Sequence, residues 1–181
     1  MIYLIRHGRT EANEKHFYCG STDLPLTESG REALKAMHYE VGTPRFITSG
    51  MKRTEETLRL LFGDVPHTVD REFREIDFGV FEMHGYEDLR ARADYQAWIT
   101  GDNDANSPPE GESGDQMRRR VVKAFRKLQE ENRDTVVITH GGVIAIILET
   151  LFPDCGHNRY QLQPRPGCGY AIEGDRFRPI P

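Results

Sequence analysis

The 181-residue sequence predicts an α/β fold with a mostly parallel central sheet flanked by helices. Three observations indicate this class. Short apolar runs typical of strands alternate along the chain with segments of helical periodicity. Residues 135–139 (TVVIT) are almost continuously β-branched, as in a central strand that is covered on both faces. The composition, with 37% hydrophobic and 29% charged residues, is that of an ordinary globular domain.

Five segments are expected to form strands. Each is short and rich in apolar or β-branched residues, and each is followed by a turn or by a helical pattern. They are residues 2–6, 45–48, 67–69, 135–139 and 169–173.

Four helices are expected between these strands, at residues 28–41, 52–62, 117–132 and 142–151. Thr27 has the side chain of an N-cap for the first of them, and Gly63 is suited to end the second. The fourth is apolar nearly all round and is therefore expected to be buried.

Residues 86–114 break this alternation. Apolar residues from Tyr86 to Ala97 are spaced as in one helix, and a polar segment with two prolines, residues 101–114, follows. We interpret residues 86–114 as an insertion over the carboxyl edge of the sheet, within a single domain of residues 1–181. Tyr95 and Trp98 are expected to pack inside the insertion, with a place in a substrate pocket as the alternative.

Charge and cysteine usage limit the partners. The net charge of −5 argues against a general nucleic-acid binder, and we interpret Arg118-Arg119-Arg120 as a solvated helix face. Arg6 interrupts the N-terminal apolar run and no later run could span a bilayer, so neither a secretory signal nor a membrane contact is expected. Three cysteines without C-x-x-C spacing indicate free thiols and a cytoplasmic protein. The oligomeric state is not predicted.

Two histidines follow strands in the same way. Arg6-His7-Gly8 comes directly after residues 2–5, and His140-Gly141-Gly142 comes directly after residues 135–139. The carboxyl ends of parallel strands lie at one edge of a sheet, where α/β folds bind ligands. A helix that starts there offers free N–H groups to an anion.

Such a set suits covalent phosphoryl transfer. A neutral imidazole is a nucleophile near neutral pH, arginines such as Arg6 and Arg53 grip phosphoryl oxygens, and a carboxylic acid can protonate the leaving oxygen. Spacing alone does not choose that acid. The candidates are Glu75, Asp70, Glu72 and Asp77.

The ordered motifs resemble those of the histidine phosphatase superfamily, with its phosphoglycerate mutase-like fold. The resemblance covers almost the whole chain. It rests on Arg6-His7-Gly8-x-Thr10-x-x-Asn13, Gly20-x-x-Asp23-x-Pro25-Leu26-Thr27-x-x-Gly30, Ser49-x-x-x-Arg53-x-x-x-Thr57, Glu75-x-Asp77-Phe78-Gly79, Gly111-Glu112-Ser113 and Thr139-His140-Gly141-Gly142.

This resemblance implies a three-layer sandwich and a role for each matched residue. His7 would attack phosphorus, and Glu75 would protonate the leaving oxygen and then activate water. Arg6, Arg53 and His140 would hold the phosphoryl oxygens, assisted by Asn13 and the backbone of Gly141. Gly20 would approach the substrate by its backbone. The scheme needs no metal and no cofactor.

The chain departs from the family pattern at three positions. Met83 and Glu110 stand where many members have glycine, and Phe81 replaces the usual tryptophan. These departures leave the catalytic residues unchanged, but they affect which substrate can be inferred from the resemblance.

The sequence therefore predicts a phosphatase for a small phosphorylated metabolite, with α-ribazole phosphate as one candidate. The first alternative is a cofactor-dependent phosphoglycerate mutase, although Ile76-Asp77-Phe78 after Glu75 lacks the basic pair expected there. The second alternative is a non-catalytic relative that binds phosphorylated ligands.

Overall fold

A six-stranded mixed sheet forms the centre of the computed structural model, which describes residues 1–181. The strand order is β3-β2-β4-β1-β5-β6, and the first four strands of this order run parallel. β5 pairs antiparallel with β1, and β6 pairs antiparallel with β5. The strands are β1 (Ile2–Arg6), β2 (Arg45–Thr48), β3 (His67–Val69), β4 (Thr135–Thr139), β5 (Gly169–Glu173) and β6 (Arg176–Ile180). The mostly parallel sheet is confirmed.

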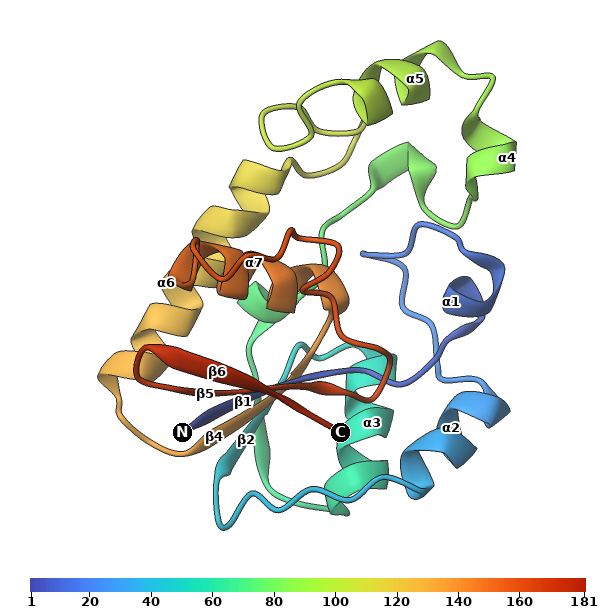
Figure 1. Cartoon of the computed structure of the whole chain (residues 1–181). Coiled ribbons are helices and arrows are strands. Elements are labelled where there is room, and N and C mark those ends of the chain that lie inside the picture. Colours follow the sequence, from blue (N-terminus) through green and yellow to red (C-terminus); the bar gives the residue numbers. More distant parts are fainter.

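Helices cover both faces of this sheet, which gives the predicted three layers (Figure 1). On one face, α6 (Gly114–Glu130) and α7 (Gly141–Leu151) pack on alternate strand residues that include Leu4 and Val137. On the other face, α3 (Lys52–Phe62) packs on Ile5 and Ile138, and α2 (Glu28–Lys35) lies against α3. No helix combines the length and the apolar content that a membrane crossing requires.

Most predicted helices are confirmed, with changes at their ends. α2 stops at Lys35, six residues before the predicted end at Val41, although the side chain of Val41 is still buried. The hydroxyl of Thr27 caps α2 as predicted, and Gly63 ends α3 with a φ of 79°. A short helix, α1 (Glu11–Lys15), follows the first histidine motif.

The insertion contains two helices where one was predicted. α4 (Tyr86–Leu89) has Arg90 as its C-cap, and α5 (Ala93–Thr100) starts anew after its N-cap, Arg92. Two single-turn helices precede them, η1 (Arg71–Phe73) and η2 (Gly79–Phe81).

An aromatic cluster of its own holds the insertion together. Tyr95 and Trp98 are buried with Phe81 and Leu89, as predicted for packing residues. The hydroxyls of Tyr18 and Tyr95 share a hydrogen bond of 2.8 Å, which ties the insertion to the loop after α1. The insertion is thus built on the loops that follow α1 and η2, beyond the sheet (Figure 1).

An ion-pair cluster fixes the other end of the insertion. The guanidinium of Arg159 donates to both carboxylate oxygens of Asp104, at 2.7 and 2.9 Å, and also to Glu149. Arg118 donates to the same two carboxylates. The pairs with Asp104 lower its pKa, with the Arg159 hydrogen bonds as the main cause. The insertion loop is therefore fastened to α6, α7 and the segment after α7.

Candidate active site

The two histidines meet at the carboxyl edge of the sheet. Because β1 and β4 are neighbours in parallel register, His7 and His140 leave the sheet side by side, and the N–H of His7 donates to the carbonyl of Thr139 at 2.9 Å. Their ring centroids are 5.2 Å apart. Both are buried, with 6% of His7 and none of His140 exposed.

The ring of His7 has a defined tautomer. Its Nδ1 lies 2.7 Å from the carbonyl oxygen of Gly8, which can only accept, so Nδ1 carries the proton and Nε2 carries the lone pair. Burial, reinforced by the charges of Arg53 and Arg6, lowers the pKa of His7 well below its ordinary value. His7 is thus a neutral imidazole with a free Nε2.

His140 is held by two polar partners. Its Nδ1 accepts from Nε of Arg53 at 3.3 Å, so Nε2 carries the proton and donates to the hydroxyl of Ser49 at 2.8 Å. Burial and the charge of Arg53 lower the pKa of His140 well below its ordinary value. No role for Ser49 was predicted from the sequence, although Ser49 is the first residue of the motif that contains Arg53.

Arg53 lies inside the site and is only 1% exposed. Besides its bond to His140, it donates from Nη1 to the carbonyl of Thr22 at 2.8 Å and from Nη2 to the carbonyl of Gly20 at 2.7 Å. Three of the five N–H groups of a guanidinium are therefore engaged. One N–H on each terminal nitrogen remains for a ligand oxygen.

Arg6 has a donor with no partner. Its Nη1 donates to the carbonyl of Pro164 at 2.9 Å, but its Nε is buried without any hydrogen bond. Burial lowers the pKa of Arg6, and nearby Glu75 opposes that effect. A buried, unpaired guanidinium N–H is costly unless a ligand supplies an acceptor for it. The guanidinium stacks so closely on Gly141 that a Cβ there would lie 3.1 Å from Cζ of Arg6.

The sequence left four carboxylates as candidates for the general acid, and their contacts in the structure differ. Glu75 reaches the start of α7, where Oε2 accepts from the N–H of Gly142 at 2.9 Å, and Oε1 accepts from the N–H of Ile76 at 3.1 Å. Asp70 caps η1 and Asp77 accepts from Ser21 and Gly79, so both serve turns. Only Glu75 among them touches the His140 motif.

Asn13 lies beside Arg6 at the rim of the site. Its Oδ1 accepts from the N–H and the hydroxyl of Thr10, at 2.9 and 3.0 Å, which leaves its NH₂ group without a partner in the chain. Arg6, Arg9 and Asn13 share a pocket of about 560 Å³. A second pocket of about 450 Å³ opens at Glu75 and has no hydrophobic lining residue.

Comparison with known proteins shows the family to which the chain belongs. A family model described as the histidine phosphatase superfamily (branch 1) matches residues 2–178. The chain belongs to this superfamily. It is 30% identical to the adenosylcobalamin/α-ribazole phosphatase of Salmonella typhimurium over 181 aligned positions, which cover 95% of this chain and 89% of the relative.

Solved structures are similar over nearly the whole chain. The α-ribazole phosphatase of Shigella flexneri superposes with a TM-score of 0.81 at 27% identity, and the match covers 97% of this chain and 92% of that structure. A phosphoglycerate mutase from Thermus thermophilus superposes with a TM-score of 0.76 at 30% identity, over 99% and 95% of the two chains. The expected fold is confirmed, and the protein is a phosphatase of the histidine phosphatase superfamily.

Gly20, expected to approach the substrate by its backbone, lies in the loop after α1. Its backbone N–H donates to Oε1 of Glu82 at 2.8 Å. A Cβ at Gly20 would collide with the carbonyl oxygen of Ile76. The need for glycine therefore comes from the close approach of two loops.

The interpretation of Arg118-Arg119-Arg120 as a solvated face was wrong for two of the three. Arg118 belongs to the ion-pair cluster of Asp104. Arg120 holds the turn before Glu75, with donor bonds to the carbonyls of Glu72, Arg74 and Glu75 and a bidentate pair with Glu112. Arg120 lies three residues after Met117 and four before Ala124, and both of these residues are buried. Residues three or four apart share a helix face, so this spacing could have indicated that Arg120 lies on the inner side of the helix.

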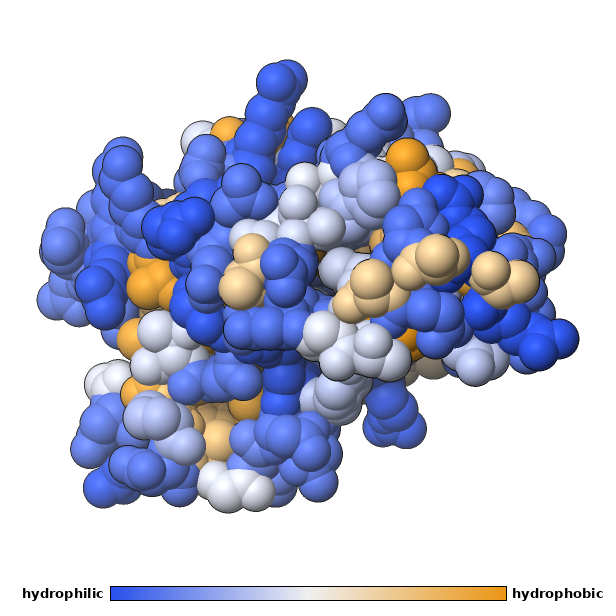
Figure 2. Space-filling view, turned by 90° about the horizontal axis from the view of Figure 1, so that it is seen from above, coloured by the Kyte–Doolittle hydropathy of each residue, from blue (hydrophilic) through white to orange (hydrophobic).

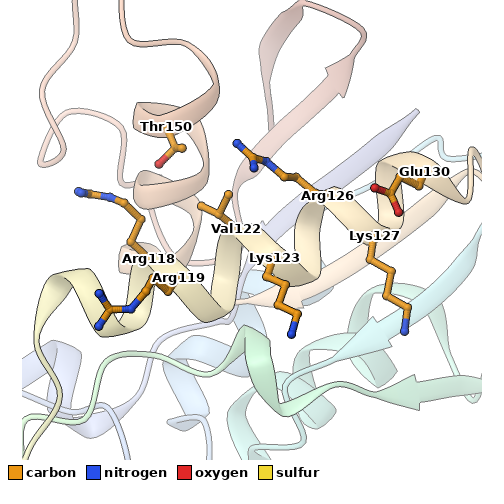
Figure 3. A pocket seen from close by; sticks show the side chains of 8 residues that line it. All are labelled: Arg118, Arg119, Val122, Lys123, Arg126, Lys127, Glu130 and Thr150. Atoms are coloured by element: carbon orange, nitrogen blue, oxygen red, sulfur yellow. The ribbon is translucent and has the colours of Figure 1, made fainter.

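The outer face of α6 carries the remaining basic residues. They line a pocket of about 710 Å³, in which Arg119, Lys123 and Lys127 form one row along the helix (Figure 3). None of the site residues lines this pocket.

Cys19, one of the three cysteines, directly precedes Gly20. Burial raises the pKa of its thiol to about 11, so the thiol is protonated at neutral pH and is a poor nucleophile. None of the three cysteines forms a disulfide.

Proposed function

We propose that this phosphatase hydrolyses a small phosphorylated metabolite through a phosphohistidine on His7, without a metal ion. In the first step the Nε2 lone pair of His7 attacks phosphorus, the bond to the leaving oxygen breaks, and that oxygen takes a proton from Glu75. In the second step the Glu75 carboxylate takes a proton from water, the oxygen of that water attacks phosphorus, and the P–N bond breaks. Inorganic phosphate and neutral His7 result.

The observation that carries this proposal is the tautomer of His7. The Nδ1 proton is bound to the Gly8 carbonyl, so Nε2 is the only ring nitrogen able to attack. A histidine kept neutral by burial and by neighbouring cations is ready for nucleophilic attack at neutral pH.

Two guanidinium groups are available to stabilise the charge that spreads over the phosphoryl oxygens. Arg6 offers its unpaired Nε, and Arg53 offers one N–H on each terminal nitrogen. Fixed cationic donors of this kind supply most of the catalysis in phosphoryl transfer. His140 would donate to an oxygen from its protonated Nε2, in exchange for Ser49.

The substrate is proposed from the relatives and from the surface around the site. The relatives named above include phosphatases of α-ribazole, so α-ribazole phosphate is the first substrate to test. The pocket at Glu75 is polar throughout, and the surface seen in Figure 2 is mostly hydrophilic, with apolar residues in small separate areas. A polar metabolite suits both features. Unpaired cysteines are compatible with the reducing cytoplasm, where we place the reaction.

Hydrolysis of p-nitrophenyl phosphate in excess EDTA, by wild type and by His7→Ala, tests the proposal. We expect activity in the wild type only, followed by a higher kcat/KM on α-ribazole phosphate than on other small phosphate esters. Activity that EDTA abolishes, or that His7→Ala retains, would contradict the mechanism. Transfer of the phosphoryl group to a second hydroxyl of phosphoglycerate would support the mutase instead.

A further inference from the structure

Glu82, at the end of η2, has the most heavily hydrogen-bonded carboxylate near the site. Its two oxygens accept from the backbone N–H groups of Gly20, Ser21 and Thr22, at 2.8 to 3.2 Å, and from the hydroxyl of Thr22 at 2.7 Å. It also accepts from the N–H of Phe78 at 3.0 Å. Consecutive N–H groups that converge on one anion form a backbone nest, and each bond is charge-assisted.

The same loop is held from its other side by Arg53. The residues Gly20 and Thr22 each give their N–H to Glu82 and their carbonyl to Arg53. Arg53 in turn donates from Nε to Nδ1 of His140. A continuous hydrogen-bonded chain therefore runs from the Glu82 carboxylate through two residues of the loop to the guanidinium and the second histidine.

The position of Arg53 depends on this chain. Arg53 is buried, and desolvation lowers its pKa, while carboxylates that include Glu82 oppose the effect. If the loop moved away, the guanidinium would lose two of its three acceptors and could rotate away from His140. Hydrogen bonds in such chains strengthen one another, so loss at one end is felt at the other.

We infer that Glu82 is a positioning residue for phosphoryl transfer, which sets the orientation of Arg53 and His140 through the loop Gly20–Thr22 without touching the substrate. This inference rests on the proposed function, because it assumes that Arg53 and His140 hold the phosphoryl group. No role for Glu82 was predicted from the sequence.

The test is a double-mutant cycle on kcat/KM for p-nitrophenyl phosphate. We expect Glu82→Gln to lose roughly 10- to 100-fold in the wild-type background, the effect of removing charge-assisted bonds. In an Arg53→Lys background, Glu82→Gln should lower kcat/KM by less than about 3-fold, because the hydrogen-bonded chain is already broken at Arg53. An equal loss in both backgrounds, or no loss in either, would overturn the inference.

Ser21→Ala is the matched control. It removes the hydroxyl bond from the same loop to Asp77 but keeps the N–H that Glu82 accepts, so we expect kcat/KM within about 2-fold of wild type. A loss as large as that of Glu82→Gln would show that any loosening of the loop suffices, and would overturn the specific role of Glu82. If circular dichroism shows that Glu82→Gln is unfolded, Glu82→Asp, which keeps the charge but shortens the side chain, takes its place in the cycle.

His7→Ala is measured beside these variants to separate the two proposals. Activity that survives in His7→Ala removes the phosphohistidine mechanism and the inference with it. If activity depends on His7 but the effects of Glu82→Gln and Arg53→Lys on kcat/KM are additive, the inference about Glu82 is wrong and the phosphohistidine mechanism stands.

Discussion

The carboxylate of Glu75 and the backbone N–H of Gly142 are 2.9 Å apart, at the first turn of α7. The contact is so close that a Cβ at Gly142 would collide with Oε1 of Glu75. The second glycine of the His140-Gly141-Gly142 motif thus makes room for the proposed acid. His140, which starts the same turn, is fixed relative to Glu75 by this contact.

Gly142→Ala should therefore displace Glu75 while leaving α7 helical, since alanine is favourable in a helix. We expect kcat on alkyl phosphates to fall by about 10-fold or more, the effect of a misplaced general acid. Steady-state kinetics on an alkyl and an aryl phosphate check this, with far-UV circular dichroism as the folding control. Unchanged kcat on the alkyl ester would show that Glu75 does not act from this position.

Glu75→Gln should slow hydrolysis most for substrates with poor leaving groups. The glutamine keeps the size of the side chain but cannot give a proton, and general acid catalysis contributes about 10²- to 10⁴-fold. A series of phosphate esters of rising leaving-group pKa should show a steeper decline of kcat/KM for the variant than for the wild type. If kcat/KM declines with the same slope in both proteins, another carboxylate protonates the leaving oxygen.

The two buried histidines should make folding stability fall below neutral pH. Burial, with the charge of Arg53 as the second cause, lowers the pKa of both His7 and His140 in the folded protein. Because they titrate near pH 6.5 in the unfolded chain, their contribution is complete above about pH 6.5 and is lost as the pH falls further, by up to about 1.4 kcal/mol per pH unit for each histidine.

Urea unfolding at pH 7.5 and pH 5.5 measures this loss. His7→Gln has one buried histidine fewer, so its stability should fall less between the two pH values than that of the wild type. An identical fall in both proteins would mean that the pKa of His7 is the same in the folded and the unfolded chain.

Glu110→Gly should stabilise the protein. Glu110 and Met83, the residues that replace family glycines, both have a φ of 60°, in the left-handed region that disfavours side chains. Because Glu110 is exposed, its replacement removes backbone strain and little else, and we expect a gain of about 0.5–1 kcal/mol. Glu110→Ala keeps the Cβ and should show no gain in thermal unfolding; equal effects of the two changes would refute the strain argument.

Strong periodicity and turn residues explain the parts of the fold that could be predicted. The β-branched run of β4 and the nearly all-apolar α7 leave few alternatives, and Thr27 and Gly63 mark helix ends by their own side chains or backbone. β6 was missed because Arg176-Phe177-Arg178-Pro179-Ile180 contains proline, which suits only an edge strand. The early end of α2 and the break between α4 and α5 depend on tertiary packing, which overrides periodicity.

For the site, the sequence predicted the strand ends but not the contacts that fix them. His7 and His140 could be paired because each follows a parallel strand, and the choice of Glu75 needed the family resemblance. The roles of Glu82 and Arg120 depend on backbone groups more than forty residues away in the chain. No local sequence pattern predicts hydrogen-bond partners that are so far apart in the chain.

Trapping the phosphoenzyme tests the central claim most directly. Wild type, His7→Ala and Glu75→Gln are mixed with a phosphate ester, quenched in alkali, which preserves phosphohistidine, and analysed by mass spectrometry. We expect one phosphoryl group on His7 in the wild type, more of it in Glu75→Gln when an aryl phosphate is used, and none in His7→Ala. Turnover with no phosphate on His7 in either active protein, or with phosphate on another residue, would contradict the mechanism.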